Sequence, residues 1–159
     1  VESDLVPLTI SSLAMSFMSL LPAEYGWTVI GCAIVPFIGL SVMGGSVMEA
    51  RKKYNVQYPN LYAVPGFHKD ADAFNQVQRG HQNAFETYPA FLVLSLLGGL
   101  KNPLICAAAG VLWIAGRMMY LRGYSKTPEG RYQGIMWVPA MLAALISSCM
   151  LAYDLINKK

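Results

Sequence analysis

The segment PLICAAAGVLWIAGRMMYL, residues 103–121, carries a single charge, at Arg117. A helix needs roughly 20 predominantly apolar residues to cross a bilayer core of about 30 Å. Pro103 suits the first position of such a helix, because a backbone N–H is not needed there. The segment therefore predicts a membrane-spanning helix.

Three further segments have the length and composition of spanning helices if polar ends and a few internal polar positions are allowed: Tyr25–Met48, Ala71–Leu100 and Arg131–Ile156. Of the 159 residues, 55% are hydrophobic and only 13% charged, whereas soluble domains are roughly a quarter charged. The four segments nearly fill the chain and leave no room for a separate soluble domain. The sequence predicts an all-α membrane protein, with a four-helix transmembrane bundle in residues 23–159.

Residues 1–22 precede this bundle as an apolar extension. Its segment Leu5–Leu21 is short and rich in Ser and Thr. A full span, an interfacial helix and the remnant of a targeting signal are all open interpretations. Val1 is not a methionine, so the chain either has a processed N-terminus or begins incompletely.

The basic residues predict an orientation. Arg51, Lys52 and Lys53 follow the first predicted span, and Arg122, Lys126 and Arg131 surround the third loop, whereas the second loop has only Lys101. By the positive-inside rule, the first and third loops face the cytoplasm or the equivalent compartment of an organelle. We expect a membrane of the endoplasmic reticulum, a mitochondrion or another organelle. The net charge of +3 comes largely from these clusters, and we expect no nucleic-acid partner.

The start of the fourth helix has its own signals. Thr127 is typical of an N-cap, Pro128 of the first helical position, and Glu129 of an acid at the positive end of the helix. This assignment places Arg131 in the first turn of the fourth helix. The three cysteines stand singly in apolar segments without C-x-x-C spacing, so we expect buried packing residues and no metal site.

Two polar stripes stand out, because ionisable residues inside a membrane are costly and commonly functional. Spacings of three and four residues place each group on one helix face: Arg79, Asn83 and Glu86 in the second helix, and Arg117, Tyr120 and Tyr124 in the third. Taken alone, any one of them fits a structural role, in an interhelical ion pair or as an interfacial tyrosine, as well as it fits a ligand site. Together, four arginines (51, 79, 117 and 131) against one intramembrane glutamate favour a site for an anionic ligand.

The polar stripes belong to motifs that resemble the MAPEG family, the membrane-associated proteins in eicosanoid and glutathione metabolism. The motifs are QRGHQNAFETYP at residues 78–89 and GRMMYLRGY at residues 116–124. ARKKY at residues 50–54 with Tyr58-Pro59, and the R-x-H-Q-N form of the second motif, are most similar to the type-3 microsomal glutathione S-transferases. The likeness extends from about Tyr25 to the C-terminus.

This resemblance implies a homotrimer with a glutathione site between subunits and no metal. By position, the implied glutathione ligands are Arg51, Arg79, Asn83, Glu86, Arg117, Tyr120 and Tyr124. Arg131 is the implied catalytic residue, which stabilises the thiolate of glutathione. The chemistry is consistent, since arginines suit the two carboxylates of glutathione and Glu86 suits its ammonium.

The sequence leads to two functional hypotheses. The first is a glutathione-dependent transferase or peroxidase that acts on lipophilic electrophiles or lipid hydroperoxides entering from the membrane lipids. The second is a non-catalytic accessory subunit of a larger, organellar membrane complex. The retained polar residues favour the enzyme, and the extra N-terminal segment favours the accessory subunit. The fold alone cannot decide between them.

Overall fold

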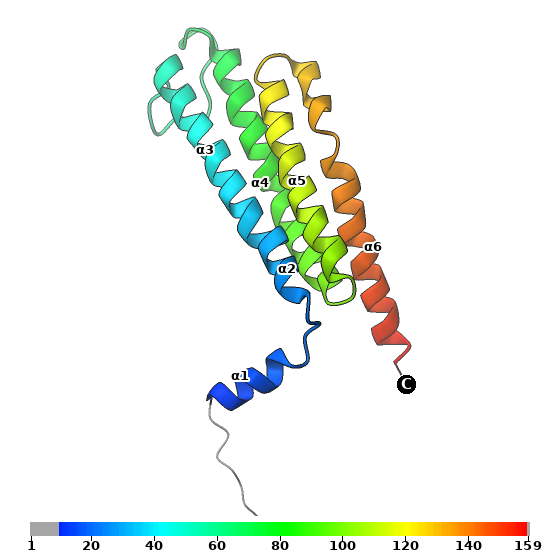
Figure 1. Ribbon diagram of the computed structural model, residues 1–159. Coiled ribbons are helices and arrows are strands. Elements are labelled where there is room, and N and C mark those ends of the chain that lie inside the picture. The colour runs from blue at the N-terminus through cyan, green and yellow to red at the C-terminus, as the bar shows by residue number, and fades with distance from the viewer. Residues whose placement is uncertain (1–9, 159) are drawn as a thin grey trace, which may run out of the picture.

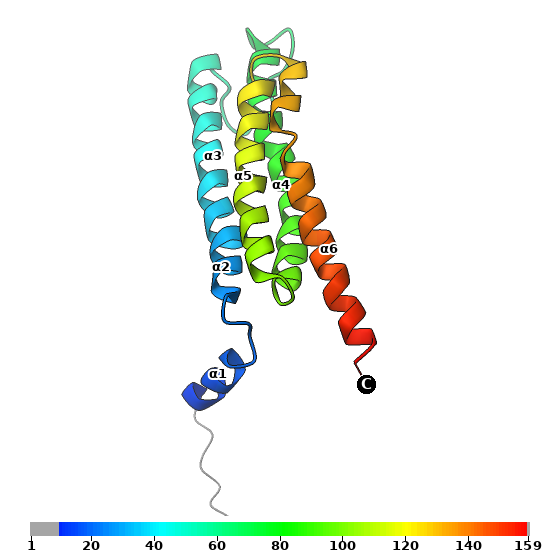
Figure 2. The same ribbon diagram turned by 45° about the vertical axis from the view of Figure 1, so that its right-hand side comes forward.

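The computed structural model of the protein describes residues 10–158, and every element in that range is a helix (Figure 1). In chain order the elements are α1 (Ile10–Met18), α2 (Tyr25–Val29), η1 (Ile30–Ile34), α3 (Val35–Tyr54), α4 (Ala71–Gly99), α5 (Pro103–Tyr124), η2 (Pro128–Gly134) and α6 (Trp137–Ile156). The first rod is formed by α2, η1 and α3 in continuous succession, and it runs beside α4, α5 and α6 (Figures 1 and 2). This arrangement confirms the predicted all-α bundle.

Three helices in the described part of the chain are long and apolar enough to cross a membrane: the first rod, α5 and α6. The fourth, α4, has 29 residues and exceeds the length that a span requires. Its N-terminal half is polar, because it carries the Arg79, Asn83 and Glu86 stripe. The polar half of α4 is therefore the part of the bundle where a ligand site is expected.

A proline explains the irregular turn in the first rod. Pro36 has no N–H, so it cannot bond the carbonyl of Cys32 as a regular helix would. The turn immediately before it, Ile30–Ile34, is a π-helix. The hydroxyl of Tyr88 on α4 donates instead to the carbonyls of Cys32 and Ala33, both at 3.3 Å. The Cys32 carbonyl that Pro36 leaves free thus links the first rod to α4 by a hydrogen bond.

The core combines aromatic stacking with close backbone contact. Phe91 of α4 and Trp113 of α5 are fully buried, and their rings stack with centroids 5.0 Å apart. Where α5 crosses the first rod, Gly110 lies against the backbone of Gly31 so closely that a side chain on either residue would overlap the other helix. Small residues at such crossings let membrane helices approach each other.

The fourth helix differs from the prediction. Thr127 is a cap as expected, and its hydroxyl accepts a hydrogen bond from the Gly130 amide at 3.2 Å. The helix that it begins, however, is the short 3-10 helix η2, and α6 starts only at Trp137. Pro139 gives the physical reason: in a continuous helix its ring would clash with the carbonyl of Ile135. The predicted helix over Arg131–Ile156 is therefore wrong in its first six residues.

Backbone contact also holds η2 in place. Gly130 of η2 and Gly123 of α5 touch backbone to backbone, and Gly134 meets Gly116 in the same way. Arg131 consequently lies in a 3-10 helix packed along α5. It does not lie in the first turn of the long fourth helix, which corrects the expectation from sequence.

The described part of the N-terminal extension forms α1. This helix has nine residues, none of them buried. At 1.5 Å per residue it is roughly 14 Å long, which is too short to cross a bilayer core alone. The remaining part of the predicted apolar segment, residues 5–9, lies outside the described residues.

The cysteines divide into two kinds. Cys32 and Cys106 are fully buried as predicted, and the Cys32 thiol donates to the carbonyl of Cys106 at 2.9 Å. Cys149 is exposed on α6, so the prediction of a buried packing residue is wrong there. The periodicity of α6 does not distinguish its outer face, because that face is apolar as well.

Candidate functional site

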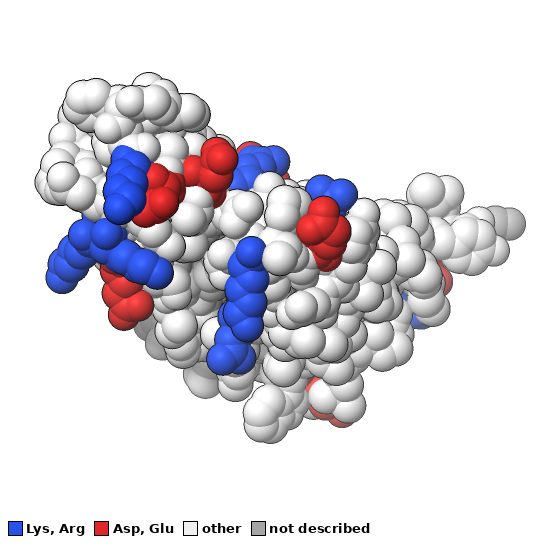
Figure 3. Space-filling model, turned by 90° about the horizontal axis from the view of Figure 1, so that it is seen from above, with Lys and Arg blue, Asp and Glu red and all other residues white. Residues whose placement is uncertain are grey.

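Charged residues gather at one end of the bundle, which we call the charged end. It is formed by the end of α3, the start of α4, the end of α5 and η2 (Figure 1). Viewed from above, this end shows lysines and arginines beside acidic residues (Figure 3). The opposite end carries Lys101, which forms an ion pair with Asp154 of α6. Both predicted polar stripes lie toward the charged end.

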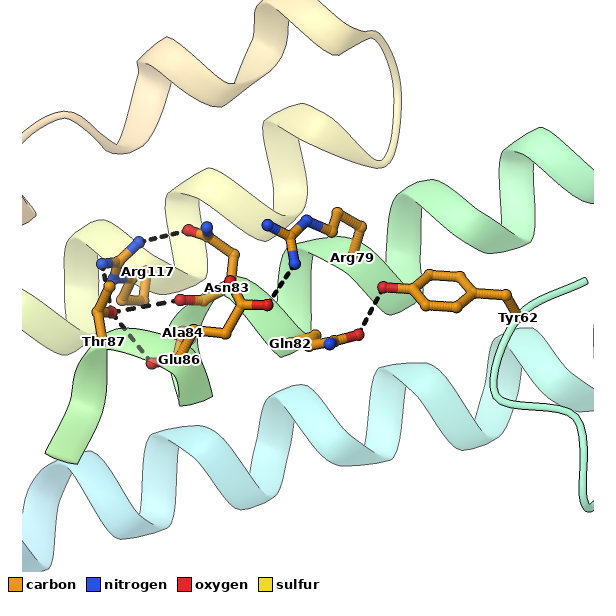
Figure 4. A network of polar contacts seen from close by, with 8 residues as sticks. All are labelled: Tyr62, Arg79, Gln82, Asn83, Ala84, Glu86, Thr87 and Arg117. Carbon is orange, nitrogen blue, oxygen red and sulfur yellow. Dashed lines mark hydrogen bonds and ion pairs between the residues drawn. The ribbon is translucent and has the colours of Figure 1, made fainter.

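On α4, Arg79 and Glu86 form an ion pair across two helical turns. The Nη1 atom of Arg79 lies 2.5 Å from the Oε1 atom of Glu86 (Figure 4). Their side chains are 42% and 43% exposed. Pairs this exposed typically contribute only about 0–1 kcal/mol to stability. The pair is therefore accessible to a ligand. Its small contribution to stability does not explain why the two residues are present.

The second stripe meets the first through Arg117. Arg117 is 1% exposed as a whole residue, and its guanidinium donates to Asn83 Oδ1 at 2.7 Å and to Thr87 Oγ1 at 2.5 Å (Figure 4). Its other face covers the ring of Trp137, with 3.8 Å between the guanidinium carbon and the ring centroid. Arg117 thus lies in the interior with both terminal nitrogens engaged. Its predicted role as a glutathione ligand stays a prediction.

Two hollows lie beside Tyr120 and Tyr124, whose ring centroids are 5.6 Å apart. The first, the polar hollow, has a volume of about 510 Å³ and is lined by Tyr62, Asp72, Asn75, Gln76, Arg79, Tyr124 and Pro128. The second, the apolar hollow, has a volume of about 230 Å³ and is lined by Tyr120, Arg131, Tyr132, Ile135, Trp137 and Val138. The two stripes therefore contribute to two adjoining hollows of opposite character.

Arg131 lies on the apolar hollow with an exposed guanidinium. Its Nη2 donates to the Tyr132 hydroxyl at 3.1 Å, and its charge acts on both Tyr120 and Tyr124. The hydrogen bond to Tyr132 raises the pKa of Arg131, so the side chain stays charged at any physiological pH. An exposed, permanent cation beside two tyrosines can stabilise an anion brought to that place.

Arg51 lies elsewhere. The residue is 8% exposed, and its Nη1 donates to the carbonyls of Val56 at 3.3 Å and Asn60 at 2.8 Å. Its guanidinium also stacks 4.4 Å from the centroid of Tyr58. Within one chain, Arg51 orders the loop after α3 and does not line either of the two hollows.

Besides Pro128, four polar residues that line the polar hollow were not among the predicted ligands: Tyr62, Asp72, Asn75 and Gln76. Asn75 fixes the loop after α3 by bonding both the amide and the carbonyl of Ala63, at 2.8 and 3.0 Å. Tyr62 donates to Gln82 at 2.5 Å (Figure 4). Helical spacing would have identified Asp72 and Gln76, which lie seven and three residues before Arg79. The position of Tyr62 depends on the loop and had no sequence signal.

Comparison with known proteins agrees with this architecture. The model of the MAPEG family matches residues 29–153. Human microsomal glutathione S-transferase 2 is 33% identical over 100 residues, which make up 62% of this chain and 63% of the human protein. The mouse protein of the same name is 36% identical over 89 residues, 55% of this chain and 56% of its own length. The uncharacterized protein sll1147 of Synechocystis is 32% identical over 112 residues, 70% of this chain and 76% of its own length.

The chain belongs to the MAPEG family, whose fold is a four-helix membrane bundle, and it is an integral membrane protein. The matched region spans less than two thirds of the length of the two mammalian relatives. Those relatives carry a type-2 name, whereas the motifs resemble the type-3 branch, so membership of that branch stays a prediction.

Proposed function

We propose that the protein is a glutathione-dependent transferase or peroxidase that acts on lipophilic electrophiles or lipid hydroperoxides. The observation that carries this proposal is the pair of adjoining hollows. Arg79 and Tyr124 line the polar hollow, and Arg131 and Tyr120 line the apolar hollow. The rings of the two tyrosines contact each other. A charged peptide thiol fits the first hollow and an apolar co-substrate the second, with the thiol near Arg131.

The polar residues match the groups of glutathione. Its carboxylates suit Arg79, whose guanidinium has five N–H donors and can engage a carboxylate in bidentate fashion. The hydroxyls of Tyr120 and Tyr124 can form hydrogen bonds with the part of glutathione that extends toward Arg131. Asn83 and Glu86 lie on the same face of α4 as Arg79, and the buried Arg117 of α5 donates a hydrogen bond to Asn83 (Figure 4). We retain all of them as proposed ligands or ligand supports.

The reaction needs no nucleophile from the protein, because the sulfur belongs to glutathione. The thiolate is the reactive form, and a cation close to it favours ionisation. In the transferase reaction, the thiolate forms a bond to the electrophilic carbon and either displaces a leaving group or adds to a conjugated double bond that then takes up a proton. In the peroxidase reaction, two glutathione molecules become one disulfide while the hydroperoxide is reduced to an alcohol and water. Arg131 is the proposed catalytic residue in both.

A homotrimer with sites between subunits is part of the proposal. Arg51 lines neither hollow within one chain, because its guanidinium is engaged by the loop after α3. It would join a site between subunits if it reached the hollows of a neighbouring subunit. The proposed surroundings are an endoplasmic reticulum, mitochondrial or other organellar membrane, with lipophilic substrate drawn from the lipid. The type-3 branch is proposed on ARKKY at residues 50–54 with Tyr58-Pro59, together with the R-x-H-Q-N motif.

A second candidate function is an accessory subunit of a larger membrane complex. The observation in its favour is α1, which precedes the bundle and buries none of its residues. Ile10, Leu13 and Phe17 are all more than half exposed there. An apolar helix outside the bundle suits a partner or a membrane surface. The proposed domain boundary between residues 22 and 23 separates this extension from the transmembrane bundle.

The test is glutathione binding by calorimetry and turnover with a generic electrophile, both in mild detergent. The enzyme proposal expects saturable binding, a thiolate absorbance in the near ultraviolet and turnover that depends on glutathione. Size measurement of the same sample should give a homotrimer. Folded protein that binds no glutathione, or that purifies only within a larger hetero-complex and is inactive, contradicts the enzyme proposal and favours the accessory subunit.

A further inference from the structure

The end of the bundle opposite the charged end has the residues typical of a membrane surface. Trp27 lies in the first turn of the first rod and Tyr153 near the end of α6, and both are more than half exposed. Tryptophan and tyrosine are enriched where the lipid headgroups meet the hydrocarbon core. Lys101 and Asp154 form an ion pair at the same end. The first rod therefore enters the membrane at its first residues, where α2 begins.

A short connection keeps α1 beside that membrane surface. Six residues, 19–24, join α1 to α2. Fully extended, they would let the two helices separate by no more than roughly 25 Å. They are not extended, because the Leu20 amide donates to the carbonyl of Phe17 at 3.1 Å. In both ribbon views α1 lies beyond the end of the rod and across its direction (Figures 1 and 2). The helix therefore stays near the membrane surface and does not continue the first rod.

The residues of α1 form two different sides. Its apolar stripe has the i, i+3, i+4, i+7 spacing that places side chains on one helix face: Ile10, Leu13, Ala14 and Phe17. The three large side chains of this apolar stripe are more than half exposed. Ser12 and Ser16 lie on the other side of the helix, together with Met15. None of the nine residues of α1 is charged. The helix is therefore amphipathic, and its polar side consists of hydroxyl groups.

Lipid and a partner protein are the two candidates to cover the apolar stripe. A helix at a membrane surface needs an apolar face toward the lipid and a polar face toward water, and α1 has both. The short connection already holds it at the level of the lipid headgroups, so lipid reaches the apolar stripe without any partner. Position and amphipathicity both favour lipid.

We infer that α1 is a membrane-surface helix. Its apolar stripe inserts among the lipids of the membrane face opposite the charged end, and its serine side faces water. Such helices are held by their buried apolar area and by attraction between basic residues and anionic lipids. Because α1 has no basic residue, only the apolar area contributes. It therefore inserts into a zwitterionic lipid surface and does not need anionic lipid. The inference holds whether or not the protein binds glutathione.

The test uses the whole chain in phosphatidylcholine vesicles, with an environment-sensitive fluorophore on one introduced cysteine at a time. The background is Cys149→Ser, since the other two cysteines are buried. Leu13→Cys and Phe17→Cys place the fluorophore on the apolar stripe, and Ser16→Cys is the matched control on the serine side. Phosphatidylcholine with a spin label near its headgroup should quench the two stripe positions severalfold more than the control. Aqueous iodide should show the reverse order, and neither result should change with added salt or anionic lipid.

A second pair of variants tests the apolar stripe itself. In the chain labelled at Leu13→Cys, Phe17→Asp places a charge on the apolar stripe, so the fluorophore should move into water and lose most of its quenching by spin-labelled lipid. Ser16→Asp places the same charge on the adjacent residue of the serine side and should keep the quenching. Equal losses in both variants would assign the effect to added charge and overturn the inference. No residue of α1 is buried, so the bundle should fold in every variant, as circular dichroism verifies.

Four other outcomes would also overturn the inference. Free access of iodide to all three labelled positions would place α1 in water. Protection of all three from both iodide and spin-labelled lipid would show that α1 packs against protein, which favours the accessory subunit. Stronger quenching of all three by a spin label at the end of the lipid chain than by one near the headgroup would place α1 inside a membrane span. Insertion that requires anionic lipid would show that attraction between charges, rather than the apolar stripe, holds the helix.

Discussion

The guanidinium carbon of Arg117 lies 3.8 Å from the centroid of the Trp137 ring, so a buried cation on α5 covers the first residue of α6. A desolvated contact of this kind contributes about 2 kcal/mol. The same guanidinium donates to Asn83 and Thr87 of α4. One side chain therefore joins three helices directly beneath the charged end. Trp137 also lines the apolar hollow, which makes Arg117 a support for the proposed site.

The first prediction concerns the stability lost when Arg117 is left without one of its two hydrogen-bond acceptors. Asn83→Leu keeps the cation in the interior but removes one of its two acceptors, so it should destabilise the protein by roughly 2 kcal/mol or more. The double variant Asn83→Leu with Arg117→Met removes the cation too. Its loss of unfolding free energy should be smaller than the sum of the losses in the two single variants. Thermal unfolding in detergent, followed by circular dichroism, gives the comparison. Additive losses would mean that the two side chains do not depend on each other.

The second prediction concerns the packing of η2 on α5. A side chain at Gly123 would overlap the backbone of Gly130, whereas Gly45, in the middle of α3, has no atom within 4 Å of the corresponding position. Both are helical glycines, so alanine at either gains up to about 1 kcal/mol in helix propensity. Gly123→Ala should nevertheless lower the unfolding temperature, while Gly45→Ala should keep or raise it. Equal effects would show that the backbone contact does not hold η2.

The helices whose bounds were predicted well are those that are specified by residues close together in the sequence. The α5 prediction, Pro103–Leu121, differs from the observed end by three residues, because a proline start and an apolar run are sequence-local signals. The stripes on α4 and α5 also follow from helical spacing alone. Their mutual contact through Arg117 and Asn83 does not, since it requires knowing which faces of the two helices meet.

The features that sequence reasoning missed depend on contacts between distant residues. Pro139 accounts for the break before Trp137, but the packing of the 3-10 helix on α5 depends on the backbone contact of Gly130 with Gly123. The burial of Arg51 requires the carbonyl of Asn60, nine residues away in an irregular loop. The role of these residues becomes visible only when the loops are placed.

The third prediction concerns topology. The structure places the loop after α3 and the turn between α5 and η2 at the charged end, with Lys101 at the other (Figure 1). In a Cys149→Ser background, which removes the exposed thiol, the variants Lys69→Cys and Lys126→Cys should react with an impermeant thiol reagent from the same side. Lys101→Cys should react only from the opposite side. Labelling of all three from one side would contradict four membrane crossings in this order.

The fourth prediction separates the enzyme from the accessory subunit through Arg131. Arg131→Leu removes an exposed cation and keeps an apolar side chain, so η2 and the oligomer should remain intact. If Arg131 stabilises the thiolate, the near-ultraviolet absorbance of bound glutathione should fall at neutral pH, because the pKa of the thiol returns toward its free value. Once that pKa lies above the assay pH, each further unit of rise lowers the thiolate fraction, and with it the turnover, by up to about tenfold.

The control for this prediction is Arg122→Leu, which makes the same change of charge at the charged end but lines neither the polar nor the apolar hollow. It should keep the thiolate signal. Binding of S-methylglutathione, which has no thiol to ionise, should be similar in the wild type, Arg131→Leu and Arg122→Leu, because Arg131 is expected to act on the sulfur rather than on docking. Equal losses of thiolate signal in both variants would assign the effect to overall charge. A wild type that binds glutathione without any thiolate signal or turnover would leave Arg131 without a catalytic role, and the accessory-subunit function would then be the better account of the fold.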